Sequence, residues 1–410
     1  MGLRNDADRI VREAIAAAQP DAAVRDALGR VRLRGGKVVL LAIGKAAWKM
    51  ALAAVAALPG RVDRGMVITK HGHAGGAIPG IAIREAGHPV PDAGTWQATD
   101  EALAMVQGLT AEDTVLFLVS GGGSSLFEKP LIPYEELADI TRQLLASGAD
   151  ITEMNMVRKR LSAVKGGRFA QICAPAHVWS IVLSDIIGDP LDMIASGPAY
   201  PDASTSEEAV QVVRRYGLTL LPQAEQLLRM ETPKALDNVD TIVNGSVSQL
   251  CASAEATCLA MGYKPIVLTD SLDCVAREAG SFLAAIARRH QDAQASLAFI
   301  AGGETVVHLR GSGRGGRNQE IALSAAAGIS GCRQTAVFSF GSDGTDGPTD
   351  AAGGYADGDT QEALRRQGIS IADVLDRNDA YPALASVGGL IVTGPTGTNV
   401  NDLSVLLIRR

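Results

Sequence analysis

The feature that most constrains the fold is a repeated order of short Val/Ile/Leu runs, each ending in Gly, Ser or Asp, and alanine-rich amphipathic stretches. The apolar runs predict strands at 37–43, 65–69, 114–119, 178–183, 241–243, 265–268, 297–300, 336–340 and 390–392. The amphipathic stretches predict helices at 46–57, 95–107, 134–146, 246–261, 274–289 and 319–327. This alternation favours βα units on a largely parallel sheet. Because the runs are continuously apolar, we expect a three-layer α/β sandwich with helices on both faces.

The chain has 410 residues, enough for two domains that each bury a core. The best candidate for a junction is the segment 221–240, which holds Pro222 and Pro233 among mixed charges. We therefore predict a Rossmann-like α/β domain over residues 1–235 and a second α/β domain over residues 236–410.

Charge and composition exclude several classes of protein. The net charge is −7, and no Lys/Arg run with interleaved aromatic residues gives a footprint for nucleic acid. No apolar run approaches the roughly 18 residues of a membrane span, and charges interrupt the first twenty residues, so we expect a cytoplasmic protein. The five cysteines contain no C-x-x-C pair, which argues against a zinc site and a disulfide framework.

The strongest local signal is the loop after the run 114–119. It consists of Ser120, Gly121, Gly122, Gly123, Ser124 and Ser125. Glycines let backbone N–H groups converge on one anion, so this loop predicts a phosphate cradle. The alternative is a flexible connection between a strand and a turn.

A second glycine-rich loop spans residues 310–320 and formally contains G-x-G-x-x-G from Gly311 to Gly316. It follows a predicted strand at 305–309 and precedes a helix near Asn318, and Asp343 ends the next apolar run, as in a dinucleotide-binding enzyme. However, the loop also carries Arg310, Arg314 and Arg317, which favours clamps for a phosphoryl group or a carboxylate. A solvated basic loop is the third possibility.

Lys45 follows the first predicted strand in a Gly-Lys-Ala sequence that is not a Walker A motif, because Ala46 replaces the Ser/Thr that holds magnesium. A lysine at a helix start suggests an anionic partner, although a surface lysine is also possible. Acidic residues recur after two later strands, at Asp185 with Asp189 and at Asp343 with Asp346. Such carboxylates suit Mg²⁺ or a general base, and Asx turns are the alternative.

Two further segments are weaker candidates. Arg158, Ser162 and Lys165 would share one helical face, which could meet phosphates or be a solvated charged surface. His88 lies in a proline-rich loop that we expect to shape a pocket.

Taken in order, these loops resemble the type 2 glycerate kinase (glycerate 2-kinase) family, whose C-terminal part is the MOFRL domain. The resemblance covers nearly the whole chain and shows no departure at the key positions. It rests on the segments 44–46, 87–89, 120–125, 155–167, 184–198, 302–305, 315–320 and 342–347.

The resemblance implies ATP- and Mg²⁺-dependent phosphorylation of D-glycerate at its 2-hydroxyl, in a cleft between two α/β domains of a monomer or homodimer. It implies Lys45, Arg317, Asp185 and Asp343 as catalytic residues, without deciding which aspartate is the base. The 120–125 loop with Lys165 would hold ATP phosphates. The substrate would contact Arg317, Asn318, His88 and Arg158, and the metal Asp189 and Asp346.

Two other interpretations remain. An NAD(P)H-dependent hydroxypyruvate reductase would use the Gly311–Gly316 loop, but the sequence lacks a convincing His with Glu or Arg arrangement for it. A non-catalytic ligand-binding protein would keep a glycine loop, but would have no use for Lys45, Arg317 and the aspartates together.

Overall fold

The computed structural model describes residues 2–184 and 186–410, which form two compact units. The Rossmann-like unit comprises residues 23–184 and 189–244. The C-terminal unit comprises residues up to 22, 186–188 and 245–410. This division differs from the predicted one because the junction follows Asn244 and because the first helix packs with the C-terminal half.

The Rossmann-like unit is built on a six-stranded sheet of order β3-β2-β1-β4-β5-β6, in which every neighbouring pair is parallel. Its strands are β1 (Val38–Ile43), β2 (Arg64–Lys70), β3 (Ile81–Ala86), β4 (Thr114–Val119), β5 (His177–Val182) and β6 (Val239–Val243). All residues of the central strands β1 and β4 are buried, as their continuous apolar runs predict. The loops that follow β1 and β4 leave the same edge of the sheet, because Ile43 pairs with Val119.

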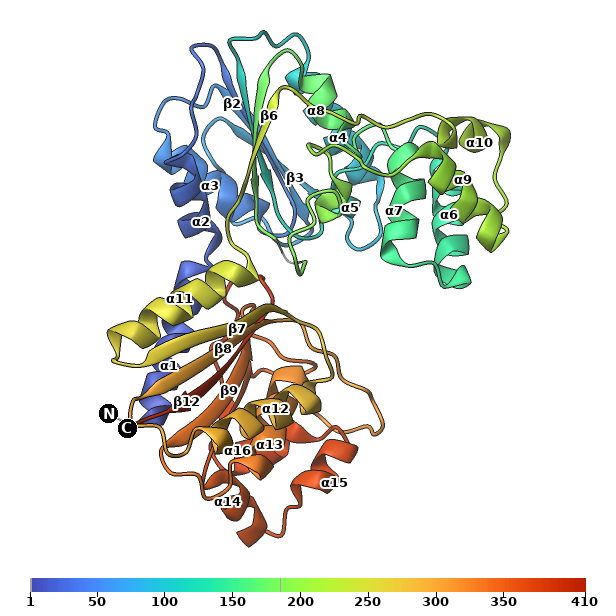
Figure 1. The fold of residues 1–410 in the computed structure, drawn as a ribbon. Coiled ribbons are helices and arrows are strands. Elements are labelled where there is room, and N and C mark those ends of the chain that lie inside the picture. Colours follow the sequence, from blue (N-terminus) through green and yellow to red (C-terminus); the bar gives the residue numbers. More distant parts are fainter. Residues whose placement is uncertain (1, 185) are drawn as a thin grey trace. The chain divides into compact units, whose positions relative to one another are not determined.

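Helices cover both faces of this sheet, which confirms the predicted three layers (Figure 1). On one face α2 (Pro20–Leu28) and α3 (Ala47–Ala57) pack against Leu40 and Leu116. On the other, α4 (Ala93–Val106) and α8 (Arg168–Cys173) pack against Leu41 and Phe117. The single-turn helix α5 (Gly123–Leu126) follows the glycine loop after β4.

A separate helical cluster stands beside the sheet of the Rossmann-like unit (Figure 1). It contains α6 (Tyr134–Ser147), α7 (Ile151–Arg160), α9 (Ser206–Tyr216) and α10 (Pro222–Leu228) around its own core. The short 3₁₀ helix η1 (Ile194–Ser196) lies in the connection from β5 to α9. Because α7 ends at Arg160, the predicted continuous helical face from Arg158 to Lys165 does not form.

The C-terminal unit has a six-stranded mixed sheet of order β11-β10-β9-β12-β8-β7. Its strands are β7 (Lys264–Leu272), β8 (Leu297–Gly303), β9 (Thr335–Gly341), β10 (Gly353–Asp357), β11 (Leu390–Ile391) and β12 (Asp402–Ile408). Only β7 and β8 pair in parallel; the other neighbours are antiparallel. The expectation of a largely parallel sheet is therefore wrong here, because the last strand inserts antiparallel between β8 and β9.

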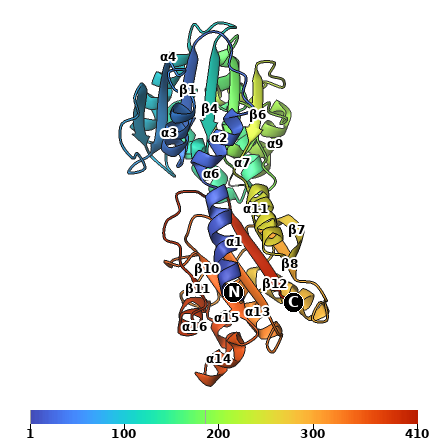
Figure 2. The ribbon, with the colours of Figure 1, turned by 90° about the vertical axis from the view of Figure 1, so that its left-hand side faces the viewer.

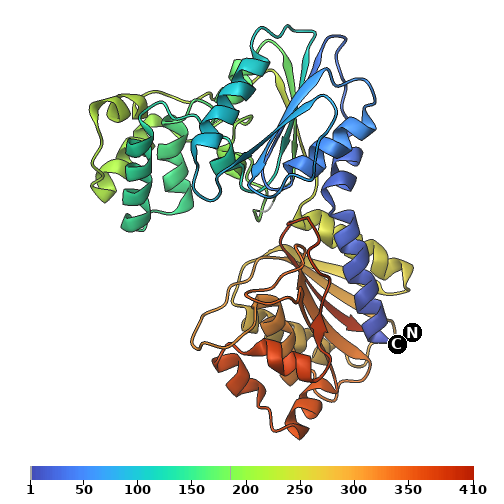
Figure 3. The ribbon, with the colours of Figure 1, turned by 180° about the vertical axis from the view of Figure 1, so that it is seen from behind.

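Helices also cover both faces of the C-terminal sheet. Figures 2 and 3 show α1 (Leu3–Ala17) beside α11 (Val247–Ala260) on one face, where Ile10 and Ala14 join the core. On the opposite face lie α12 (Ala276–Arg289) and α13 (Arg317–Gly328), with α14 (Thr360–Arg366), α15 (Ile371–Asp376) and α16 (Ala380–Ser386) packed on α13. In the part of the chain that the structure describes, no helix is long and apolar enough to cross a membrane.

Candidate functional site

The glycine loop after β4 is tied to the loop after β1 by three hydrogen bonds. Ser120 Oγ donates to the Ile43 carbonyl at 3.1 Å and accepts from the Ala46 N–H at 3.1 Å. The Lys45 N–H donates to the Gly121 carbonyl at 2.9 Å. Gly44 permits this approach, because a Cβ there would lie 2.3 Å from Ser120 Oγ. The two predicted loops thus form one surface.

Lys45 and His88 meet at Gly122. A Cβ on Gly122 would lie 2.9 Å from the His88 ring and 3.4 Å from Lys45 Cε, and Gly122 has a φ of +84°. The Lys45 side chain is exposed, and no carboxylate among the described residues pairs with its ammonium. Burial and the nearby charge of Lys45 lower the pKa of His88, so its imidazole is neutral at pH 7. Lys45 and His88, which the sequence predicted separately as site residues, therefore lie beside the same glycine.

Arg158 adds a second cation to this unit. It lies near the end of α7 and is partly exposed, while its Nε is buried without a hydrogen-bond partner. No described carboxylate pairs with the guanidinium. One turn earlier on the same helix, Asn155 Oδ1 accepts a hydrogen bond from Ser196 Oγ, which lies 2.9 Å from Ser124 Oγ.

Lys165 occupies a different position from the predicted one. Its side chain is 0% exposed, and its Nζ donates to the carbonyls of Ser124 at 2.7 Å and Phe127 at 3.1 Å. It also forms an ion pair of 3.0 Å with buried Glu128. The ammonium is thereby enclosed by protein partners and buried, so Lys165 supports the glycine loop from beneath and is poorly placed to meet a phosphate.

Asp185 and Asp189 are the acidic residues predicted after the strand that became β5. Asp185, predicted to be catalytic, lies outside the described residues. Asp189, a predicted metal ligand, has a φ of +48° and a buried Oδ1 without a hydrogen-bond partner. Within the described chain, no group of three or more His, Cys, Asp or Glu side chains is arranged to hold a metal ion.

In the C-terminal unit, Arg317 begins α13 and is held by two carboxylates. Its Nε donates to Asp402 Oδ2 at 2.5 Å and its Nη2 to Oδ1 at 3.1 Å, while Nη1 contacts Glu304 at 2.9 Å. Burial lowers the pKa of Arg317, but Asp402 and Glu304 outweigh it and the pKa lies above its ordinary value. Three of the five N–H groups are used, and the side chain keeps 34% of its surface exposed.

Asp343 lines a cavity of about 330 Å³ together with Arg317, Glu304 and Asp402. Its Oδ1 accepts the Thr345 N–H at 2.9 Å, and its other oxygen has no partner within the described residues. Asp343 and Arg317, which were each predicted as site residues, thus line the same cavity, and one carboxylate oxygen of Asp343 has no partner among the described residues.

Two other predicted site residues of this unit, Asp346 and Asn318, are buried and hydrogen-bonded to other residues of the protein. Asp346 is 3% exposed, and its oxygens accept the backbone N–H groups of Asn318 at 3.1 Å and Gln319 at 2.9 Å. It stabilises the start of α13, which leaves it poorly placed to bind a metal. Asn318 is 1% exposed, and its side chain bonds Asp346 and Ser339, so it does not reach a substrate.

The Gly311–Gly316 loop lines a cavity of about 770 Å³ with Val306, Pro348 and Glu320. The predicted strand at 305–309 is absent from the described structure, where only Val306 forms an isolated bridge with Val275. A dinucleotide fingerprint requires a strand that runs directly into the glycine loop. The loop therefore lacks that context, although the predicted helix follows it.

Sequence reasoning left Ser196, Glu304 and Asp402 out of the site. Ser196 and Glu304 lie in motifs that carried the resemblance, whereas β12, which begins with Asp402, was not predicted as a strand. The available signal for Asp402 was an aspartate at the start of a mostly apolar run, 403–408, because a carboxylate needs a partner when its strand is buried.

Comparisons with known proteins place this geometry in a family. Residues 6–229 match a domain of unknown function (DUF4147), and residues 297–402 match the MOFRL family. D-Glycerate 2-kinase of Thermotoga maritima is 49% identical over 99% of this chain and 98% of that protein. A protein of Agrobacterium vitis with the provisional name hydroxypyruvate reductase is 40% identical over 98% of this chain and 93% of that protein.

A crystal structure described as glycerate kinase from Thermotoga maritima superimposes with a TM-score of 0.96 at 49% identity and covers 99% of both chains. Both the sequence match and the fold match therefore extend over essentially the whole chain. The chain belongs to the glycerate 2-kinase family, with a C-terminal MOFRL part.

Proposed function

We propose that this protein transfers the γ-phosphoryl group of ATP to the 2-hydroxyl of D-glycerate, which yields 2-phosphoglycerate and ADP. The observation that carries the proposal is two cations without a carboxylate partner among the described residues. Lys45 lies at Gly122, and Arg158 lies on α7, whose Asn155 is linked through Ser196 to Ser124. The names of full-length relatives support the same activity. Unpaired cations beside a glycine loop suit a substrate and a co-substrate that are both anions.

Phosphoryl transfer needs positioning and charge neutralisation more than covalent chemistry by the protein. We assign Lys45 to the transferring phosphoryl group, because its exposed ammonium lies beside Gly122. Arg317 has a similar role, since Asp402 and Glu304 fix its plane and leave two N–H groups for oxygen ligands. The neutral His88 imidazole donates or accepts a hydrogen bond at the same loop without adding charge.

Arg158 is our candidate for the carboxylate of glycerate. A guanidinium binds a carboxylate through two parallel hydrogen bonds, and the partly exposed side chain of Arg158 has no competing described acid. This contact would favour the binding of acids over neutral polyols. An uncharged ligand would remove water from the Arg158 guanidinium without replacing its hydrogen bonds, and this loss costs free energy.

Mg²⁺ fits one part of the site. Asp343 has one oxygen without a partner among the described residues and lines the same cavity as Arg317. A single carboxylate is a sufficient protein ligand when phosphate oxygens and waters complete the shell. Bound there, the ion would neutralise phosphate charge. Asp346 does not fit this role because both oxygens accept backbone N–H groups. Of the two aspartates that the resemblance implies as catalytic, this leaves Asp185 as the proposed acceptor of the 2-hydroxyl proton.

A coupled assay tests the proposed reaction. Purified protein is given D-glycerate, ATP and Mg²⁺, and the product is detected through enolase with and without phosphoglycerate mutase. We expect ADP formation that depends on glycerate and a product that enolase alone consumes. A requirement for the mutase would indicate transfer to the 3-hydroxyl. Absence of ADP, together with NAD(P)H oxidation by hydroxypyruvate, would replace the kinase with the reductase.

A further inference from the structure

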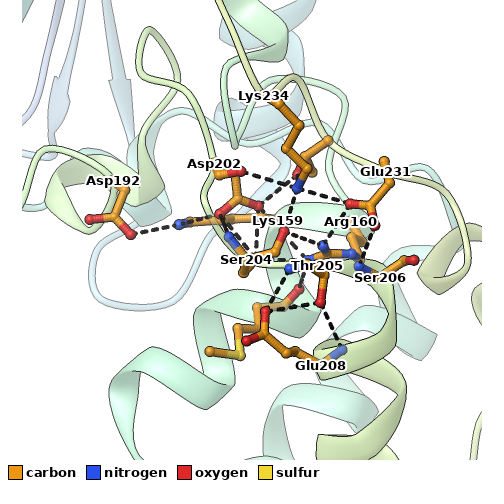
Figure 4. Close-up of polar contacts among 12 residues, drawn as sticks. Lys159, Arg160, Asp192, Asp202, Ser204, Thr205, Ser206, Glu208, Glu231 and Lys234 are labelled. Carbon is orange, nitrogen blue, oxygen red and sulfur yellow. Dashed lines mark hydrogen bonds and ion pairs between the residues drawn. The ribbon is translucent and has the colours of Figure 1, made fainter.

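The segment 192–202 between β5 and α9 is fastened to helix α7 at both ends and in the middle. Lys159 Nζ bonds Asp192 Oδ2 and Asp202 Oδ1, each at 3.2 Å (Figure 4). Both Lys159 and Asp202 are almost fully buried. Burial raises the pKa of Asp202, but Lys159 and Thr232 outweigh it and hold the pKa below its ordinary value. One turn before Lys159, Asn155 Oδ1 accepts the Ser196 hydroxyl at 3.0 Å.

The middle of this segment has an unusual backbone. Ala195, Ser196 and Gly197 have consecutive φ values of +52°, +61° and +64°. Left-handed conformations cost energy in residues other than glycine, so the surrounding structure must impose them. The N–H groups of Gly166 and Gly167 donate to the carbonyls of Ser196 at 3.0 Å and Gly197 at 2.7 Å. These contacts fix the place of a buried hydroxyl, Ser196 Oγ.

The hydrogen bonds around Ser196 determine which of the two hydroxyls, Ser124 or Ser196, donates in the contact between them. The Asn155 amide nitrogen faces Met193 Sδ at 3.6 Å, so its oxygen faces Ser196 and accepts the Ser196 proton. The Ser196 oxygen can then only accept from Ser124, whose Oγ lies 2.9 Å away. Ser124 is partly exposed, whereas Ser196 is 0% exposed and Asn155 4%. The exposed side of Ser124 Oγ therefore offers lone pairs and no proton.

The other two serines of the loop have also used their protons internally. Ser120 Oγ donates to Ile43 O at 3.1 Å, and Ser125 Oγ donates to Gly122 O at 3.2 Å. A phosphate oxygen requires a donor, so Ser124 is unsuited to phosphate and suited to a ligand hydroxyl. The chain of hydroxyls ends at an amide oxygen, which does not accept a proton at neutral pH. Ser124 consequently has no route for a proton taken from the reacting hydroxyl.

We propose that Ser124 Oγ accepts a hydrogen bond from the non-reacting hydroxyl of the acceptor acid, and that Ser196 and Asn155 are positioning residues that fix this polarity. The ligand class is a hydroxycarboxylate with a second hydroxyl group, and the inference rests on the proposed kinase function. Arg158 lies three residues after Asn155 on the same helix, so the carboxylate and the second hydroxyl would be recognised from neighbouring positions of α7 and the glycine loop. Selection of a dihydroxy acid over a monohydroxy acid is the consequence.

The test compares D-glycerate with D-lactate, which lacks the second hydroxyl. Dissociation constants of both acids are measured by calorimetry for the full-length protein, and kcat and KM for ATP are measured separately. We expect the wild type to bind glycerate about 5- to 10-fold more tightly than lactate, as one net hydrogen bond permits. In Ser124→Ala this ratio should fall to about 1, through weaker glycerate binding, with lactate binding and the KM for ATP little changed.

Further variants distinguish the role of the hydrogen bonds that link Ser124, Ser196 and Asn155 from simple structural damage. Ser125→Ala removes a neighbouring hydroxyl that donates only to Gly122 O and should keep the ratio. Asn155→Leu should reduce the ratio as Ser124→Ala does, whereas Asn155→Asp retains an acceptor and should preserve it even if both acids bind more weakly. Folding of each variant is checked by circular dichroism and thermal unfolding.

The outcomes distinguish this inference from the proposed function. A wild type that forms ADP with glycerate but binds lactate equally well, or a Ser124→Ala variant with an unchanged ratio, overturns the role of Ser124. Absence of glycerate-dependent ADP formation in the wild type overturns the kinase function itself.

Discussion

Lys165 and Glu128 form an ion pair of 3.0 Å in which the side chains are 0% and 1% exposed, directly beneath the Ser120–Ser125 loop. Burial lowers the pKa of Lys165, and the Glu128 carboxylate opposes this effect. Glu128 also accepts the Ser162 hydroxyl at 2.5 Å. The pair thus connects two segments that are distant in sequence, 124–128 and 162–165, and its removal should act on folding before it acts on ligand binding.

Lys165→Met should lower the free energy of unfolding by about 3–5 kcal/mol, because it leaves Glu128 buried without its cation. Urea denaturation followed by circular dichroism measures the loss. The double variant Lys165→Met/Glu128→Gln should recover a large part of it. A stable Lys165→Met protein with a raised KM for ATP would instead indicate direct contact with the nucleotide.

Lys45→Ala should reduce kcat by about 10²–10³-fold, the usual effect of removing one group that stabilises transition-state charge. Its ammonium is exposed and lacks a described acidic partner, so the unfolding midpoint should stay unchanged. Lys49→Ala, an exposed lysine one turn further along the chain, is the matched control and should retain activity. Equal activities of the two variants would remove Lys45 from the mechanism.

Asp402→Asn should reduce kcat about 10- to 100-fold, because Arg317 loses its charged two-point partner. Arg317→Lys should have a comparable effect, since an ammonium does not reproduce the planar fork. If Asp402 acts by orienting Arg317, the double variant will be little worse than either single variant. Multiplicative losses in steady-state kinetics would show that the two residues act independently.

The Asp346 carboxyl should make stability depend on pH. Burial raises its pKa to about 6 in spite of two backbone hydrogen bonds, whereas in the unfolded chain the carboxyl has its ordinary pKa of 3.8. Between these pH values the folded state binds the extra proton, so this group's contribution to stability is greatest below pH 4 and is lost as the pH rises through 6.

Asp346→Asn lacks this titration. The difference in free energy of unfolding, wild type minus variant, should therefore grow by roughly 2–3 kcal/mol as the pH falls from 7 to 4. Urea denaturation across this range measures it. A difference that is constant with pH would mean that Asp346 titrates alike in the folded and unfolded states.

Local patterns determined much of this protein. Continuous apolar runs predicted the buried strands β1 and β4, and amphipathic stretches predicted α3 and α13 within one or two residues of their observed starts. Glycines after β4 placed the candidate anion loop, and Lys45 could be assigned to the same sheet edge because parallel strands bring such loops together. The ordered motifs were sufficient for the family.

Other properties depended on contacts between distant segments. Nothing local distinguishes Lys165 from Lys45, yet one is buried against Glu128 and the other is exposed. Asp346 caps α13 because the chain returns to that helix, and Asp402 meets Arg317 because β12 inserts between β8 and β9. The contact between Ser124 and Ser196 likewise depends on the left-handed backbone that positions Ser196. Tertiary packing alone decides such matters, because it sets which polar groups lose water and which partners replace it.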